Sequence, residues 1–290
     1  MNKKYLCIAL ISISIFTVGC AKTKDVQIKP DSNTQTKTAN VAKPTTTDIS
    51  TDKATNTEHS EPASNNVGSS STDTYQLSKN VYTNKNITVN YPQIINLGDT
   101  NKQKSINEII KSEALKVLNY HNDNTDDLTL NINYEIKWKS GNLLSLQYSG
   151  VGYSKGVAHP NNLLYTTNIN LDKVAKLKLT DIVKVDQTLV NKFKNGTYKS
   201  QQTPDQSLKA AAEESVQLLT TDTLIKNFNN ADSLDNIGTE NQSDTFSYFT
   251  KDSLGISVGI SHAAGDHAEF EIKYQDIQNN INTKNKYLLP

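Results

Sequence analysis

Two short stretches of the sequence contain residue types that could do chemistry. The first is Gly152-x-Ser154-x-Gly156, the pattern of a serine-hydrolase nucleophile elbow, and His159 follows the serine five residues later. An elbow needs a strand before the serine and a helix after it, because the helix N-terminus helps to build the oxyanion hole. Here Pro160 and two asparagines follow instead, and the residue before a proline avoids helical geometry. We interpret the stretch as a turn, with a serine triad that uses a later histidine as the alternative.

The second stretch is His262-Ala-Ala-Gly265-Asp266-His267, which places three potential metal ligands within six residues. Histidine and carboxylate side chains are common zinc ligands. The spacing, however, fits no compact ligand pattern, and the glycine does not favour a helical face that would hold the ligands together. We therefore predict exposed loop histidines, and neither a metal nor another cofactor. Trp138, the only tryptophan, is expected to pack in the core.

The elements that would position these residues begin with a set of strands. Residues 128–138 alternate apolar and polar side chains, and a turn at 139–142 leads into a second strand that continues to Tyr148. Such alternation indicates one buried and one exposed face, which is typical of an antiparallel sheet. Residues 163–171 are predicted as a third strand. Further upstream, 86–91 is predicted as a strand and 102–120 as a helix, whose apolar residues recur at helical spacing.

The second half of the chain contains more predicted helix. Residues 188–198 and 205–228 are predicted as helices, and 275–281 as a short last helix. Residues 245–260 are predicted as a hairpin and 268–274 as a further strand. Strands and helices are partly segregated, so the predicted class is α+β, with antiparallel sheets and packed helices. We expect two successive α/β subdomains, at residues 75–175 and 176–290.

The composition bounds the possible partners. The 290-residue chain has 30 basic and 30 acidic residues, and none of the basic ones is an arginine. Binding to nucleic acid depends on concentrated positive charge, and arginine supplies the planar fork that grips phosphates. We therefore predict that nucleic acid is not a partner.

The first 20 residues have the pattern of an export signal that ends in a lipid-modified cysteine. A short basic start precedes an apolar run over residues 5–16. That run is shorter than the roughly 20 residues that a transmembrane helix needs, and it fits the apolar region of a signal peptide. Gly19 and Cys20 follow, which resembles the lipobox of bacterial lipoproteins. We predict that Cys20 carries the lipid, and that it is the only cysteine left after the leader is removed.

Residues 21–74 are predicted to be a disordered tether. They contain no aromatic residue and no leucine, and consist mostly of threonine, serine, asparagine, lysine, aspartate and alanine. Such a segment cannot bury enough apolar surface to offset the entropy of ordering it. The sequence thus predicts a domain that is anchored to the outer face of the cell membrane, in a cell of Gram-positive type.

Three motifs occur in an order that resembles a known family. They are Gly156-x-Ala158-His159-Pro160 between two strands, Leu177-x-Leu179-x-Asp181-Ile182, and His262-Ala263-Ala264-Gly265 before a strand. They are similar to the extracellular module that the anti-sigma factor RsiV shares with the non-catalytic N-terminal part of the peptidoglycan deacetylase PdaC. The resemblance covers roughly residues 80–282. It implies a PdaC-like module over 75–175 and an RsiV-like one over 176–290.

The resemblance implies a binding function. The RsiV domain recognises lysozyme, so the implied partner is a lysozyme-like protein or peptidoglycan, with no catalysis by this chain. Gly156, Ala158, His159 and Pro160 are expected to form a structural turn or to contact the partner. The alternative is an enzyme that modifies cell-wall polysaccharide, or an accessory subunit of one.

Overall fold

The computed structural model describes residues 75–121, 126–199 and 206–289. The strands are β1 (Gln76–Asn84), β2 (Ile87–Ile95), β3 (Leu128–Lys139), β4 (Leu143–Ser154), β5 (Asn161–Asn170), β6 (Ala175–Leu177), β7 (Thr197–Lys199), β8 (Thr245–Phe249), β9 (Ser253–Gly259) and β10 (His267–Lys273). The α-helices are α1 (Thr100–Leu115), α2 (Leu179–Ile182), α3 (Gln187–Lys194), α4 (Gln206–Leu218) and α5 (Thr221–Asn229). This mixture of sheets and helices confirms the predicted α+β class.

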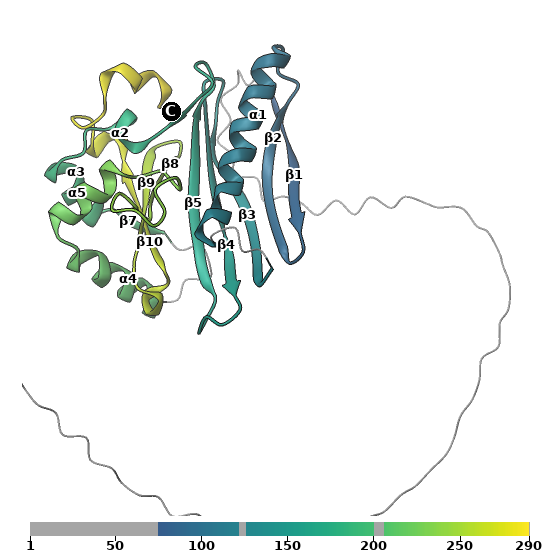
Figure 1. Ribbon diagram of the computed structural model, residues 1–290. Helices are drawn as coiled ribbons and strands as arrows, with labels where there is room; N and C mark the ends of the chain where they lie inside the picture. The colour runs from purple at the N-terminus through teal and green to yellow at the C-terminus, as the bar shows by residue number, and fades with distance from the viewer. Residues whose placement is uncertain (1–74, 122–125, 200–205, 290) are drawn as a thin grey trace, which may run out of the picture. The chain divides into compact units, whose positions relative to one another are not determined.

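The first sheet has the order β1-β2-β3-β4-β5-β6, and α1 lies against one of its faces (Figure 1). Its neighbouring strands are antiparallel except for β2 and β3, which pair in parallel at Ile87–Val89 and Leu130–Ile132. The structure thus adds one parallel pair to the antiparallel pairing that the sequence predicts. The reason is topological: α1 lies between β2 and β3 in the chain, and a crossover of this kind brings the next strand back in the same direction.

Helix α1 has a clear start and a single buried stripe. The carboxylate of Asp99 accepts hydrogen bonds from the backbone N–H groups of Asn101 and Lys102, which caps the first turn. Ile106 and Ile110 are fully buried against the sheet, as the helical spacing predicts. The α-helix ends at Leu115 and continues as a 3-10 turn over Lys116–His121, so the predicted helix was correct in position but changes type in its last part.

The face of the first sheet that α1 covers is apolar. Leu146 and Tyr148 of β4 are fully buried there, and the rings of Tyr148 and Tyr165 stack with their centroids 4.8 Å apart. The Tyr165 hydroxyl donates to the carbonyl of Ala114 in α1 at 2.7 Å. This layer is a hydrophobic core with a few polar ties to the helix, which also include two hydrogen bonds between the Asn107 side chain and the backbone of β2.

The opposite face of β4 and β5 is also buried, because a second sheet covers it. That sheet has the order β7-β10-β9-β8, with antiparallel pairing throughout. Polar side chains on this face of the first sheet, including Ser145, Gln147 and Asn168, are at most 2% exposed. The prediction of an exposed face is therefore wrong for β4, since its polar residues on this side meet hydrogen-bonding partners rather than water.

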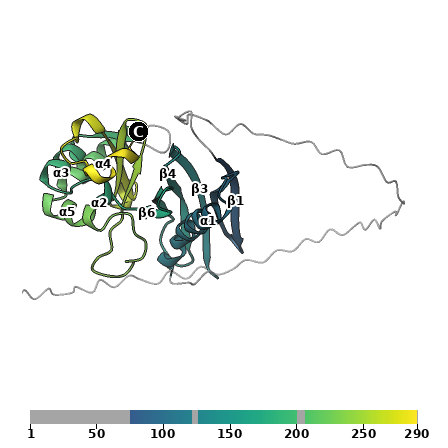
Figure 2. The same cartoon turned by 90° about the horizontal axis from the view of Figure 1, so that it is seen from above.

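Helices α2 to α5 lie on the far side of the second sheet from the first one (Figure 2). Phe193 of α3, Phe228 of α5 and Phe270 of β10 form the centre of this core, with edge-to-face ring contacts at 5.2 and 5.3 Å. Trp138 is 7% exposed and belongs to the same core, so it packs in the interior as the sequence predicts.

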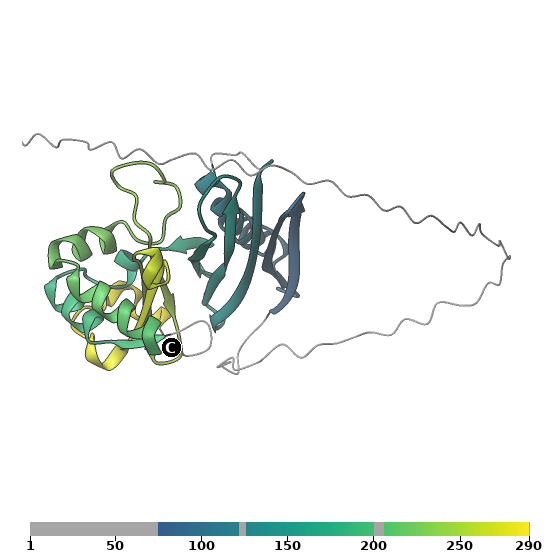
Figure 3. The same ribbon diagram turned by 90° about the horizontal axis from the view of Figure 1, so that it is seen from below.

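Local signals explain where the second half departs from the predicted helices. The helix expected over 205–228 is divided in two, because Thr220 caps the start of α5 through a hydrogen bond from the Thr223 N–H. The helix expected over 188–198 ends at Lys194, and Thr197–Lys199 forms the edge strand β7. The predicted last helix is only a 3-10 turn at Tyr274–Asp276. The long connection between α5 and β8 projects as a loop (Figure 3).

The two sheets follow each other along the chain, but their cores exchange residues. Leu234 and Phe246, from the second half, belong to the core under α1, while Trp138 and Leu143 belong to the core of the second sheet. The division into subdomains at residues 75–175 and 176–290 stays a prediction. Cys20, the leader and the segment 21–74 lie outside the described residues. Within the described residues, no helix is long and apolar enough to cross a membrane.

Candidate functional site

The turn that contains the sequence motif lies between two antiparallel strands. Strand β4 ends at Ser154, and β5 begins at Asn161, so a strand rather than a helix follows the serine. Gly156 has φ of 92°, a left-handed conformation that glycine adopts without strain. Ala158, His159 and Pro160 are exposed in the same turn. The geometry that an elbow requires is therefore not formed here.

The His262 loop connects β9 to β10. His262 begins a 3-10 turn that ends at Gly265, whose φ is 112°, and Asp266 also has a positive φ of 72°. The Ile260 N–H donates to the Asp266 carbonyl at 2.9 Å, which closes the loop. His262 is exposed, as the sequence predicts, whereas His267 is only partly exposed because it already belongs to β10.

These two stretches, about a hundred residues apart in the chain, meet in the structure. The rings of His159 and His262 stack face to face, with centroids 3.6 Å apart and planes 7° apart. Asp266 contacts residues of both stretches: its Oδ1 lies 2.9 Å from Nδ1 of His262, and its Oδ2 accepts the backbone N–H of Asn162 at 2.7 Å. The β4–β5 turn and the β9–β10 loop are thus tied together through one carboxylate.

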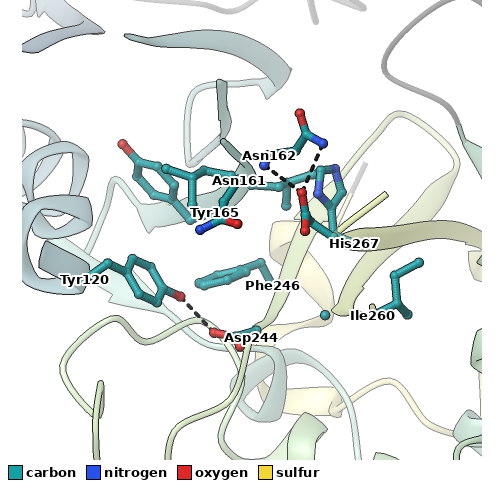
Figure 4. Close-up of a pocket in the computed structure, with 12 residues that line it drawn as sticks. Tyr120, Asn161, Asn162, Tyr165, Asp244, Phe246, Ile260 and His267 are labelled. Carbon is teal, nitrogen blue, oxygen red and sulfur yellow. Dashed lines mark hydrogen bonds between the residues drawn. The ribbon is translucent and has the colours of Figure 1, made fainter. Parts of the chain in front are cut away.

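A pocket of about 260 Å³ lies directly beside this junction (Figure 4). It is lined by Tyr120, Asn161, Asn162, Leu163, Leu164, Tyr165, Asp244, Phe246, Gly259, Ile260, Asp266 and His267. These residues come from the 3-10 turn after α1, the first half of β5, the end of the α5–β8 loop, β8, and the β9–β10 hairpin with its loop. The site therefore needs both sheets to be in place.

Two polar features distinguish this pocket. The Tyr120 hydroxyl donates to Oδ1 of Asp244 at 2.8 Å, which holds that carboxylate at the pocket edge (Figure 4). Nδ1 of His267 is buried and has no hydrogen-bond partner in the part of the chain described. Burial lowers the pKa of His267, although the nearby Asp266 opposes this effect, so its imidazole is neutral at pH 7.

A glycine allows Asp244 to approach the second sheet. The Gly259 N–H donates to the Asp244 carbonyl at 2.7 Å. A Cβ on Gly259 would lie 2.9 Å from Cβ of Asp244, closer than real Cβ atoms approach a neighbour. The backbone of β9 thus sets the position of the carboxylate.

Sequence reasoning found the two loops but not the pocket. His159, His262, Asp266 and His267 were singled out as motif residues, and the structure brings them together. Tyr120 and Asp244 carry no local signal, because they reach the pocket only through the packing of the two sheets. Asn161 and Asn162 could have been proposed, since they directly follow the motif. Among the residues that the structure describes, no group of three His, Cys, Asp or Glu side chains is arranged to hold a metal ion.

A comparison with protein families finds a match within the first sheet. The family model described as deacetylase PdaC matches residues 76–162, from β1 to the first residues of β5 and thus through the His159 turn. None of the curated proteins matches the chain.

Six chains among the solved structures match. One is a member of the DUF3298 family from Bacteroides fragilis NCTC 9343, with 16% identity, a TM-score of 0.41, and coverage of 73% of this chain and 93% of that one. Another is a DUF3298 family protein from Pseudomonas aeruginosa PAO1, with 11% identity, a TM-score of 0.40, and coverage of 74% and 95%. The family-model match shows that residues 76–162 are similar to the PdaC family.

Proposed function

We propose that the chain is a non-catalytic binding module of the cell envelope, held outside the membrane by a lipid on Cys20. The observation that carries the proposal is the contact between the His159 turn and the His262 loop at the edge of the pocket. Two loops that meet on a rigid two-sheet scaffold form a continuous surface for a partner, since binding residues are often found on loops positioned in this way.

The proposed partner is a lysozyme-like protein or peptidoglycan. The match of residues 76–162 to the PdaC family model supports a role at the cell wall. The resemblance of the motifs to RsiV supports lysozyme as the first partner to test. The stacked histidines and the adjoining pocket are the contact surface that we propose for it.

Binding is tested by calorimetric titration of the full chain with lysozyme, and by co-sedimentation with insoluble peptidoglycan. His159→Ala should weaken binding about tenfold, because it removes an exposed aromatic contact at the centre of the proposed surface. Val81→Ala is the control, since Val81 is 48% exposed on β1, away from the pocket lining. Equal effects of the two substitutions would contradict the proposed surface.

Catalysis is tested with the same protein and peptidoglycan as substrate. We expect no released sugar, acetate or peptide, with or without a chelator. Turnover that a chelator or His159→Ala abolishes, in a protein that still folds, would instead establish a wall-modifying enzyme.

The anchor has its own test. We expect the full chain in the membrane fraction, labelled by a palmitate analogue, and the Cys20→Ala variant to be unlabelled and released from the membrane. Two or three acyl chains anchor stably where one would exchange. Equal labelling of both proteins would contradict the proposed lipidation site.

A further inference from the structure

The pocket combines an apolar wall with carboxylate groups. Phe246 and Leu164 are 3% and 8% exposed, and Ile260 is partly buried beside them. Asp244 lines the pocket as well, and the Tyr120 hydroxyl points at its carboxylate (Figure 4). A side chain with an apolar stem and a polar end would match this division.

The charge of the lining is negative. Asp244 and Asp266 both line the pocket, and no lysine is among its lining residues. Asp266 is engaged by His262 and Asn162. Asp244, by contrast, makes no ion pair within the described ranges, and its hydrogen bonds there, from Tyr120 and Gln242, both go to Oδ1.

The effect of this carboxylate is visible on its neighbour. Burial, followed by the charge of Asp244, raises the pKa of the Tyr120 hydroxyl far above its ordinary value. Tyr120 therefore remains a neutral donor, and it leaves the negative charge of Asp244 uncompensated. An uncompensated carboxylate at the edge of an apolar pocket favours a cation and disfavours an anion.

Two further polar side-chain groups of the lining have no hydrogen-bond partner among the described residues. Nδ1 of His267 is buried without a partner in the described part, and a buried polar atom of this kind calls for a ligand or a water molecule. The side-chain amide of Asn161 makes no hydrogen bond to another described residue, and Asn161 is exposed at the pocket mouth. An ammonium group has three N–H donors and no acceptor, so in this pocket it can donate to the carboxylate of Asp244.

We propose that this pocket receives a lysine side chain of a protein or peptide partner, with the ammonium group at Asp244 and the alkyl stem against Phe246 and Ile260. The inference rests on the proposed binding function and specifies the chemistry of its partner. Lysine side chains place their methylene groups along apolar surface while the charged end stays at a polar edge. The volume of about 260 Å³ is below that of pockets for drug-sized ligands, and it suits one side chain.

The direct test uses a small probe on the full chain. Nα-acetyl-lysine methylamide is titrated into isotope-labelled protein while the NMR signals of Phe246, Ile260 and His267 are followed. We expect saturable shifts confined to pocket residues, with a dissociation constant in the millimolar range that weakens as salt is added. The norleucine analogue, which keeps the stem and lacks the charge, should shift these signals much less.

A pair of matched variants separates the pocket carboxylate from the general charge of the surface. Asp244→Asn should weaken probe binding about tenfold, because a hydrogen bond to a charged group is lost, while the amide oxygen can still accept from Tyr120. Glu240→Gln removes an exposed carboxylate of the same loop that does not line the pocket. It should leave the affinity unchanged.

Other outcomes would overturn the inference. They are equal binding of lysine and norleucine probes, equal effects of the two variants, or tighter binding of glucosamine than of the lysine probe, which would point to an amino sugar. The proposed function is judged separately. If lysozyme binds the Asp244→Asn variant with unchanged affinity, the lysine pocket is contradicted, whereas the proposed binding function is retained. Conversely, binding of the lysine probe together with no binding of lysozyme or peptidoglycan would support the lysine pocket and contradict the proposed binding function.

Discussion

The two faces of β4 and β5 are both buried, but by different means. On one face, Leu146, Tyr148 and Tyr165 pack against α1 and the neighbouring strands with little hydrogen bonding. On the other face, Ser145 and Asn168 are hydrogen-bonded to each other at 2.7 Å and to the backbone of β8. The same strands are therefore held on one side by apolar burial and on the other by specific polar pairing.

The polar face is a connected network. Ser145 Oγ accepts the Phe249 N–H at 2.9 Å, and Asn168 Nδ2 donates to the Ser247 carbonyl at 2.8 Å. Asp232 accepts from the N–H and hydroxyl of Ser247 at 2.6 and 2.7 Å. Apolar packing tolerates changes that keep volume, whereas each buried polar atom requires its own partner. We infer that the polar face fixes how the second sheet lies on the first, and with it the pocket.

The largest expected effect is on the apolar face. Leu146→Ala removes a fully buried side chain and should lower the free energy of unfolding by about 3–4 kcal/mol. Leu146→Met keeps most of the volume and should cost less than about 1.5 kcal/mol. Urea denaturation of both variants measures the difference. A similar loss in the two would show that this face is not an ordinary apolar core.

The next effect concerns pH and the polar face. Glu269 of β10 is 3% exposed and accepts a hydrogen bond from Gln147 of β4. Burial raises the pKa of Glu269 from its ordinary 4.5 to about 7; Glu135 and Glu271 add to the shift, while Lys137 and the Gln147 hydrogen bond oppose it.

The sign of the pH effect follows from these values. Between pH 4.5 and 7 the folded protein keeps the Glu269 proton that the unfolded chain releases, so stability falls as pH rises through this range, by about 3 kcal/mol in total. Glu269→Gln should abolish that part of the pH dependence and be more stable than the wild type at pH 8. Parallel stability curves from pH 4 to 8 for the two proteins would contradict this.

A smaller effect tests the network alone. In Asp232→Asn the amide offers one acceptor oxygen where the carboxylate accepts from Ser247, from the Leu179 N–H at 2.7 Å and from Thr166. The loss of stability should be about 2 kcal/mol, since a buried donor is left without a partner. Asp222→Asn on the exposed side of α5 is the control and should change stability by less than about 0.5 kcal/mol. If the denaturation curves of the Asp232→Asn and Asp222→Asn variants coincide, the polar network does not contribute to stability as we infer.

The smallest effect lies at the tip of the β4–β5 hairpin, which neither layer covers. Gly156→Ala meets no atom within 4 Å of the new Cβ, so its cost comes from the backbone φ of 92° alone. We expect a loss of about 1 kcal/mol. By contrast, a Cβ at Gly150 in the covered part of β4 would lie 1.9 Å from the Asn131 carbonyl oxygen. Gly150→Ala should therefore be far more damaging than Gly156→Ala in the same thermal melt.

The apolar half of this comparison was predictable from the sequence, and the polar half was not. The spacing of Ile106 and Ile110 and the alternation along β3 and β4 predict α1 and its sheet, because apolar periodicity reports one buried face directly. Ser145 and Gln147 have the residue types of an exposed face, and nothing local indicates that β8 and β10 cover them. Their burial depends on partners about a hundred residues away.

The candidate site divides in the same way. His159 and His262 stand in recognisable turn motifs, so the two loops could be found from local patterns. Their stacking, and the position of Asp244 beside them, follow from the docking of one sheet on the other. The parallel pairing of β2 with β3 was missed for a related reason, since strand direction depends on the path of the connecting helix.

The central claim is that this envelope module binds a partner at the pocket junction without transforming it. Calorimetric titration of the full chain with lysozyme, repeated with His159→Ala, tests that claim most directly. We predict saturable binding near one-to-one stoichiometry, weakened about tenfold by the substitution. A flat titration, or identical isotherms for the wild type and the variant, would contradict it.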